Sequence, residues 1–208
     1  KDVKFCLAFI HSPSSFHSSK KKIVVPDDVK GMKVRPAHAT MANFVTSLGG
    51  TNVQSSAPEV RDIIERGVAD AVTFPWGSLV LFGIDKVTKY HMDAPLYVTT
   101  FTFVMNKDKY NQMSDRQKQA IDKNCSVETA GQVGEHWGKF EDAGVDKVKA
   151  QADHEVYKLT PEQTAQWKKA SEPLVKTWGE AVKKNGNDPD AALSELRATL
   201  TKYKALAQ

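Results

Sequence analysis

Between residues 31 and 74, the spacing of hydrophobic positions switches repeatedly between the two-residue period of a strand and the three-to-four-residue period of a helix. Glycines mark some of these switches, as at Gly49-Gly50, where a helix is expected to stop. In chain order, the pattern predicts a strand, a helix, a strand, a helix and a strand at 32–35, 37–48, 51–54, 56–67 and 68–74. This alternation is typical of a parallel, doubly wound α/β sheet.

Apolar runs on both sides of this region predict further strands. Residues 3–10 form one such run, and residues 97–105, which are rich in β-branched and aromatic side chains, form the strongest one. The stretch 11–22 is polar and is expected to form a loop. Its aromatic residue, Phe16, is expected to act either as a lid over a pocket or as a local plug.

The second half of the chain is expected to be mainly helical. Capping boxes at 114–117 and 160–163 predict two helix starts. Gly131, Gly134 and Gly138 follow at three- and four-residue steps on one helix face. Because these positions carry no side chain, we expect another element to approach the helix closely there.

Two of the predicted strands end in residues that suit a binding site. Arg35 ends the strand 32–35, and Phe74-Pro75-Trp76 follows the strand 68–74. In open α/β sheets, ligands bind outside the carboxyl ends of the strands, so these residues are expected to converge. An arginine in that place can hold a carboxylate through two parallel hydrogen bonds. The alternatives are an ordinary surface arginine and core positions for Phe74 and Trp76.

Composition and charge are those of an ordinary globular protein. Hydrophobic residues make up 40% of the 208 positions and charged residues 26%, and no apolar run reaches the length of a membrane span. The net charge is +4, but the lysines of the second half are interleaved with acidic residues. This pattern favours a solvated surface over a nucleic-acid-binding stripe, so we expect no nucleic-acid partner.

Recognisable catalytic and metal-binding motifs are absent from the sequence. The six histidines show no metal-ligand spacing, so neither a metal site nor a cofactor is expected. The two cysteines, Cys6 and Cys125, fall in a strand-like and a helical run, which favours two separate buried thiols. An α/β enzyme that uses Asp70 or His38 as a base remains an alternative.

Several blocks of the chain together resemble one family. The order and spacing of these blocks are similar to those of the DctP-like solute-binding proteins of TRAP transporters, which are periplasmic proteins. The resemblance covers nearly the whole chain. The blocks that carry it are 29–35, 48–50, 58–60, 67–71, 103–107 and 114–121.

The resemblance implies a fold and a function. It implies the type II periplasmic-binding-protein architecture, with two α/β lobes and a ligand cleft between them, and no enzyme activity. It implies that Arg35 pairs with a substrate carboxylate, and that the protein captures organic acids in the periplasm and passes them to the membrane subunits of the transporter. The expected regions are an α/β lobe at 11–100, a remnant of the first lobe with a long connecting helix at 101–150, and returning C-terminal elements at 151–208.

The chain departs from the family pattern in three places. It resembles only the later two-thirds of family members, so most of the first lobe is expected to be missing. Many members carry Glu-Asn-Pro where this chain has Thr73-Phe74-Pro75, so a phenyl ring replaces an amide. Some members also carry a second arginine, whose position would fall near Ser15, and this chain has no arginine there.

These departures favour an aromatic or 2-oxo monocarboxylate as the ligand, since polar contacts are replaced by aromatic walls. A C4-dicarboxylate is the alternative within the family. A further alternative is a truncated chain that forms dimers or swaps domains through the open edge of strands 3–10 and 97–105. The expected ligand-binding residues are Arg35, Phe74, Trp76, Thr73, Phe16, Ser15 and His38.

Overall fold

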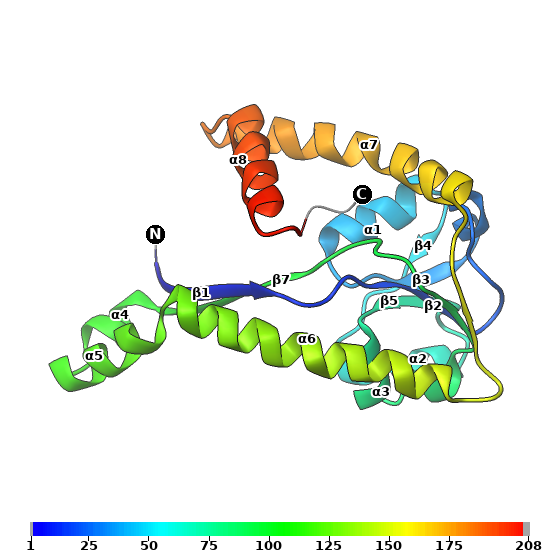
Figure 1. Cartoon of the computed structure of the whole chain (residues 1–208), viewed down its shortest axis with the longest axis horizontal. Coiled ribbons are helices and arrows are strands. Elements are labelled where there is room, and N and C mark those ends of the chain that lie inside the picture. Colours follow the sequence, from blue (N-terminus) through cyan, green and yellow to red (C-terminus); the bar gives the residue numbers. More distant parts are fainter. Residues whose placement is uncertain (1, 206–208) are drawn as a thin grey trace.

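A six-stranded sheet covered by helices on both faces forms the larger part of the molecule, and a two-stranded ribbon projects from it (Figure 1). The computed structural model describes residues 2–205. The strands of the sheet, in spatial order, are β4 (Thr51–Asn52), β3 (Lys33–Arg35), β5 (Ala71–Phe74), β2 (Ser15–Ser18), β6 (Tyr90–Met92) and β8 (Glu155–Tyr157). The ribbon pairs β1 (Val3–Ile10) with β7 (Thr100–Asn106).

The predicted alternation of strands and helices is confirmed. Strand β3 pairs in parallel with both β4 and β5, and the helices α1 (Ala39–Ser47) and α2 (Val60–Glu65) connect them. A hydrophobic cluster lies on each face of the sheet, one containing Phe44 of α1 and the other Ile64 of α2. The α/β fold class and the doubly wound arrangement therefore follow from the local pattern.

The predicted loop at 11–22 is wrong, because residues Ser15–Ser18 form the strand β2 in the middle of the sheet. This strand runs antiparallel to both β5 and β6, which makes the sheet mixed. Phe16 is fully buried and packs against Trp167, with ring centroids 5.6 Å apart. The polar residues His17 and Ser18 hid the nature of this strand, since their side chains bond to the carbonyls of Phe74 and Asp70 inside the fold.

Three histidines form a hydrogen-bonded chain inside the sheet. His17 Nε2 donates to the carbonyl of Phe74 over 3.0 Å, so His17 Nδ1 accepts from His91 Nδ1, also over 3.0 Å. His91 Nε2 then accepts from His154 Nδ1 over 2.9 Å. Burial lowers the pKa of His17 to about 4. Burial, followed by the charges of His17 and His154, lowers the pKa of His91 to about 2.

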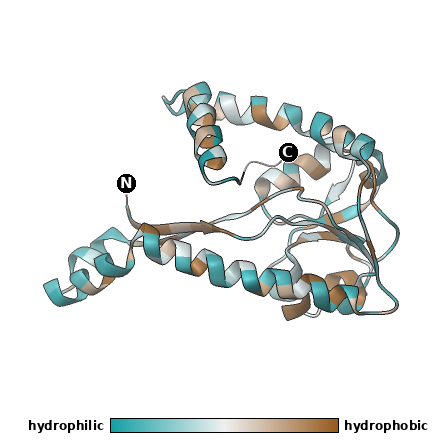
Figure 2. Ribbon diagram, viewed as in Figure 1, coloured by the Kyte–Doolittle hydropathy of each residue, from teal (hydrophilic) through white to brown (hydrophobic). Residues whose placement is uncertain are grey.

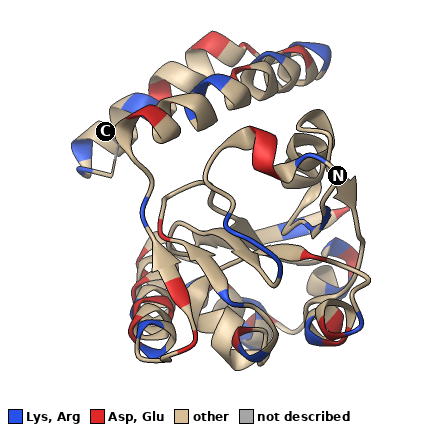
Figure 3. Cartoon of the chain, turned by 90° about the vertical axis from the view of Figure 1, so that its right-hand side faces the viewer, with Lys and Arg blue, Asp and Glu red and all other residues tan. Residues whose placement is uncertain are grey.

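The remaining helices cover the sheet or extend along the ribbon. The capping boxes at Ser114 and Thr160 are confirmed as helix starts. Acidic and basic positions alternate along these helices, as predicted for a solvated surface (Figure 3). Within residues 2–205, no helix is long and apolar enough to cross a membrane. The helices are α3 (Trp76–Leu81), α4 (Lys107–Asn111), α5 (Asp115–Asn124), α6 (Val127–Lys149), α7 (Pro161–Lys184) and α8 (Pro189–Lys202).

The ribbon carries α4 and α5 at its outer end, and the long helix α6 runs from there back to the sheet (Figure 1). A disulfide between Cys6 of β1 and Cys125 joins the ribbon to the end of α5. The prediction of two separate thiols is therefore wrong. The two cysteines are 119 residues apart, and only the tertiary fold brings them together.

The C-terminal elements return to the sheet. Strand β8 pairs in parallel with β6, and the indole of Trp167 in α7 donates to the carbonyl of Val24 over 3.0 Å. Brown, apolar positions concentrate on the ribbon strands and on α3, whereas α4 and α5 are mostly hydrophilic (Figure 2). The division into regions 11–100, 101–150 and 151–208 stays a prediction.

Helices α3 and α6 approach each other at Gly77 and Gly144, where a Cβ on Gly144 would collide with the backbone of Gly77. The expected close approach at Gly131, Gly134 and Gly138 is wrong, because the space around the first two is open and Gly138 meets only a serine side chain at 3.8 Å. The periodic glycines thus stand about two to four helical turns before Gly144, where a glycine is needed.

The carboxylate of Glu141 in α6 locks this contact. Its Oε2 accepts from the backbone N–H groups of Gly77 and Ser78 over 2.5 and 3.3 Å. Its Oε1 accepts from the Ser78 hydroxyl over 2.8 Å and from the Trp137 indole over 3.0 Å. Glu141 is only 1% exposed, so these four bonds replace the water that the carboxylate loses on burial.

Replacing Glu141 by glutamine should destabilise the protein strongly, because the amide NH₂ cannot accept from the donors that face it. We expect E141Q to lower the free energy of unfolding by about 2–4 kcal/mol, as for buried donors left without partners. Asp142→Asn on the exposed side of the same helix is the matched control and should change it by less than about 0.5 kcal/mol. Urea denaturation measures both, and equal effects would contradict the bridging role.

The free energy of unfolding should also decrease as the pH is lowered, because His17 is buried in its neutral form. In the unfolded chain His17 titrates near pH 6.5, but in the folded state only near pH 4. Between these values the unfolded state binds more protons, so the free energy of unfolding should drop as the pH falls, by about 3 kcal/mol for His17 alone. Urea denaturation from pH 7 to pH 4 measures this slope. His17→Gln should flatten it, whereas substitution of the exposed His136 should not; an unchanged slope in H17Q would refute the assignment.

Candidate ligand-binding site

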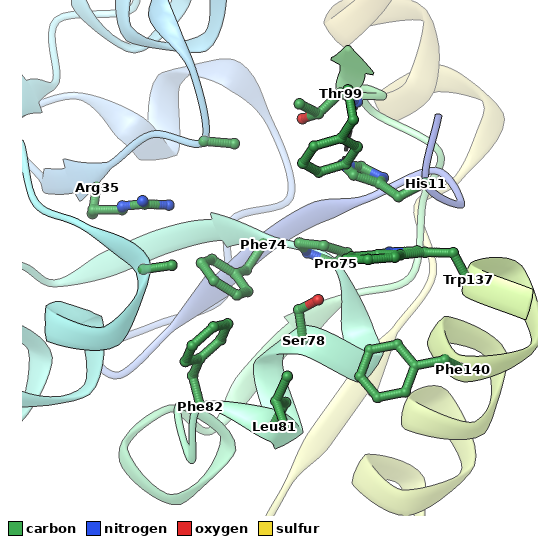
Figure 4. A pocket seen from close by; sticks show the side chains of 13 residues that line it. His11, Arg35, Phe74, Pro75, Ser78, Leu81, Phe82, Thr99, Trp137 and Phe140 are labelled. Atoms are coloured by element: carbon green, nitrogen blue, oxygen red, sulfur yellow. Dashed lines mark hydrogen bonds between the residues drawn. The ribbon is translucent and has the colours of Figure 1, made fainter. Parts of the chain in front are cut away.

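A cavity of about 330 Å³ lies at the carboxyl ends of β3 and β5, between α3, α6 and the start of β7 (Figure 4). Residues from all these elements line it, so the cavity joins the sheet to the long helix and the ribbon. The lining residues are His11, Arg35, Ala37, Ala57, Phe74, Pro75, Ser78, Leu81, Phe82, Thr99, Phe101, Trp137 and Phe140.

Arg35 provides the positive charge of the cavity. It is 9% exposed, and its Nε and Nη2 donate to the carbonyl of Ser55 over 3.2 and 3.0 Å. These bonds use one edge of the guanidinium, and Nη1 has no hydrogen-bond partner among the described residues. The edge formed by Nη1 and Nη2 is therefore free to receive both oxygens of a carboxylate.

Burial lowers the pKa of the Arg35 guanidinium, and Tyr97 opposes this effect in part. The guanidinium still carries its charge at neutral pH, since arginine does not lose its proton under such conditions. Among the described lining residues, no other Lys or Arg and no Asp or Glu is present. A single positive charge therefore stands in a largely apolar cavity, which favours one anionic group on the ligand.

Aromatic rings form most of the remaining wall. The Arg35 guanidinium lies 5.4 Å from the ring centroid of Phe74, and Phe82 meets Phe74 edge to face at 5.9 Å. On the opposite side, Trp137 lies 5.6 Å from Phe101 and 6.3 Å from Phe140. Figure 4 shows the side chains from the sheet facing those from α6 across the cavity. An aromatic ligand body would find ring surfaces on both sides.

Of the residues expected to bind ligand, Arg35 and Phe74 are brought together as the strand topology predicts. Adjacent parallel strands carry them, with Arg35 opposite Val72 in the register. Trp76 does not line this cavity, because its ring points toward the sheet and packs on His17 at 4.7 Å between centroids. The alternative of a core position therefore describes Trp76 better.

The other expected site residues lie behind the cavity wall. Thr73 is buried, and its hydroxyl accepts from the backbone N–H of Ala37 over 2.7 Å, which holds the loop after Arg35. His38 caps α1 by accepting from the backbone of Met41. Ser15 is buried in β2, and Phe16, in the opposite hydrophobic cluster, also does not reach the cavity. Asp70 accepts from the backbone N–H of Lys33 over 2.8 Å and lies outside the cavity lining as well.

Several lining residues were not identified from the sequence. Trp137 and Phe140 were interpreted only as apolar positions of a helix, although they face the cavity from α6. Phe82, Phe101 and Ser78 gave no signal, since no local pattern shows which face of a short helix or ribbon a ligand will meet. Among the described residues, no group of three His, Cys, Asp or Glu side chains could hold a metal ion.

Comparison with known proteins places this geometry in one family. The sequence matches the DctP family model, described as bacterial extracellular solute-binding protein, family 7, over residues 7–181. The structure resembles a TRAP periplasmic solute-binding protein from Bordetella bronchiseptica with bound (R)- and (S)-mandelate, with a TM-score of 0.88 and 24% identity. That match covers 97% of this chain and 64% of the other.

Further solved structures of TRAP solute-binding proteins also resemble this chain. A TRAP solute-binding protein from Rhodoferax ferrireducens with copurified benzoate matches with a TM-score of 0.86 and 24% identity over 97% of this chain and 64% of its own. A marine metagenome protein specific for aromatic acid ligands, in complex with metahydroxyphenylacetate, matches with a TM-score of 0.85 and 29% identity over 96% and 64%. Matches with lower TM-scores include proteins with bound β-D-galacturonate and L-malate.

The chain thus spans 64% of the length of these solved relatives. The match to a solute-binding family agrees with the prediction of a binding protein and favours it over the alternative of an enzyme with a base at Asp70 or His38. Since the family model covers most of the chain, the protein belongs to the DctP family of bacterial extracellular solute-binding proteins.

Proposed function

We propose that this chain is the ligand-holding part of a TRAP transporter receptor that binds an aromatic monocarboxylate. The observation that carries the proposal is the free edge of Arg35, which stands beside Phe74 in a cavity lined mainly by aromatic rings. The carboxylate would lie on Nη1 and Nη2, and the ring would lie between the walls formed by β5 and α6. Such a ligand satisfies the one charge and fills the apolar space.

The chemistry of the relatives supports this ligand class. Mandelate, benzoate and metahydroxyphenylacetate, bound by the three compared proteins, each combine one carboxylate with one aromatic ring. Relatives with galacturonate or malate show that the fold also accepts polar acids. The choice for this chain therefore depends on its own lining residues, and Phe74 and Trp137 favour the aromatic acids.

A C4-dicarboxylate fits the cavity less well. Its second carboxylate would need a second cationic or multiply donating partner, because burial of an unpaired charge is very costly. Among the described lining residues, Arg35 is the only cationic side chain, and the opposite wall presents Trp137 and Phe140. A small 2-oxo acid would pair with Arg35 but would leave most of the 330 Å³ unfilled.

The remaining parts of the proposal follow from the family. A receptor of this kind works outside the cytoplasm, in the periplasm, and delivers its ligand to the membrane subunits of the transporter. Helices α3 and α6, held together through Glu141, would keep their lining residues in place while the ligand enters. Closure around the ligand would then exclude water from the pair formed by Arg35 and the carboxylate.

Isothermal titration calorimetry against two sets of acids tests the ligand class. We expect benzoate, phenylacetate or mandelate to bind with a lower Kd than succinate, malate or pyruvate, because only the aromatic acids bury a ring against Phe74 and Trp137. A difference of tenfold corresponds to about 1.4 kcal/mol of binding free energy. Tighter binding of succinate or malate would refute the aromatic assignment and support the dicarboxylate alternative.

Arg35→Ala should weaken binding of the aromatic acid by at least about a hundredfold, because loss of one partner of a buried ion pair costs about 3–5 kcal/mol. Arg35→Lys should recover part of the loss, since it restores the charge but not the two-pronged geometry. Arg66→Ala, on the exposed end of α2, is the control and should bind as the unchanged protein does. Stopped-flow measurements should show the effect mainly in the dissociation rate. Binding by R35A within threefold of the unchanged protein would contradict the proposed clamp.

A further inference from the structure

We propose that Ser78 forms a polar subsite that selects aromatic acids with a hydroxyl group on the ring. This inference rests on the proposed function and adds to it a substituent that the cavity recognises. Ser78 belongs to α3, is 7% exposed and lines the same cavity as Arg35. In Figure 4 its hydroxyl oxygen points up from α3 toward the side chains of Pro75 and Trp137.

The hydrogen of the Ser78 hydroxyl has a fixed direction. It is donated to Glu141 Oε1 over 2.8 Å. The same carboxylate accepts from the indole of Trp137 and from the N–H groups of Gly77 and Ser78, which can only donate. The Ser78 oxygen is therefore left with acceptor capacity toward the cavity, and the adjacent carboxylate strengthens it as an acceptor.

The polar side chains around it have their capacity used elsewhere. The only donor of the Trp137 side chain, its indole N–H, already bonds to Glu141. His11 Nδ1 bonds to the carbonyl of Ser12 over 2.5 Å, and its Nε2 accepts from the backbone N–H of Thr99 over 3.2 Å. Apart from Arg35, the described lining side chains that can still bond to a ligand are thus the hydroxyls of Ser78 and Thr99.

The required ligand group follows from this geometry. Because Ser78 acts as an acceptor, its partner must carry a hydrogen, as a phenolic hydroxyl does. A methyl ether at the same ring position has no hydrogen to give, and its lone pairs would face those of Ser78. The subsite therefore separates hydroxylated rings from methoxylated rings of similar shape, which a purely aromatic wall would not do.

Calorimetric titration with a matched series of acids tests the proposal. The series is benzoate, 3- and 4-hydroxybenzoate, and the corresponding methoxybenzoates. We expect at least one hydroxybenzoate to bind about fivefold or more tightly than benzoate, the gain typical of one added hydrogen bond, and its methyl ether to lose that gain. If neither hydroxybenzoate binds more tightly than benzoate, the subsite is refuted while the proposed function stands. If no acid in the series binds, both fail.

The variant Ser78→Ala assigns the effect to this side chain. It should reduce the preference, measured as the ratio of the Kd for benzoate to the Kd for the hydroxybenzoate, to about one, because the acceptor that faces the ligand is lost. The bond from Ser78 to Glu141 is lost as well, so the ratio and not the absolute affinity is the readout. Thr99→Val is the comparison variant and should retain the preference. A preference that survives in S78A, or that disappears in T99V, would overturn the assignment. If S78A does not fold, which circular dichroism shows, the ligand series and T99V on their own still decide between the outcomes.

Discussion

The buried carboxylate of Glu141 is the interaction on which the site depends. It joins the first turn of α3 to α6 through three hydrogen bonds, a fourth bond within α6 holds the indole of Trp137, and both helices contribute lining residues to the cavity. The approach that permits these bonds requires glycine at both Gly77 and Gly144, where a Cβ would meet backbone. The contact between the two helices, the bonds of the Glu141 carboxylate and the position of the Trp137 ring are therefore coupled. A shift of α6 would break the bonds to α3 and displace Trp137 at the same time.

The charge in the cavity is placed by the sheet. Parallel pairing of β3 with β5 sets Arg35 beside the end of the strand that carries Phe74, and the carbonyl of Ser55 holds one edge of the guanidinium. The other edge remains available. Because the ligand meets a fixed donor pair and fixed rings, recognition needs little reorganisation of this part of the chain, which favours affinity.

Local patterns were sufficient for the parts of the fold whose side chains obey a simple period. They predicted the strands and helices from 31 to 74, the capping boxes at Ser114 and Thr160, and the convergence of Arg35 with Phe74. They failed where long-range contacts satisfy polar groups. Strand β2 was interpreted as a loop because it is polar, and the hydrogen-bond partner of His17 lies 74 residues away in the sequence. The disulfide was missed because its two cysteines are 119 residues apart. The aromatic wall from α6 was missed for the same reason, since helical spacing marks Trp137 as apolar without showing what it faces.

The central claim is that Arg35 and the rings around it hold the carboxylate and the body of one aromatic acid. A crystal structure of the protein with bound benzoate tests this claim most directly. The account predicts both carboxylate oxygens within hydrogen-bond distance of Arg35 Nη1 and Nη2, with the benzoate ring packed on Phe74 and facing Trp137. A benzoate held elsewhere, or one whose carboxylate avoids Arg35 while the guanidinium contacts only Ser55, would contradict it.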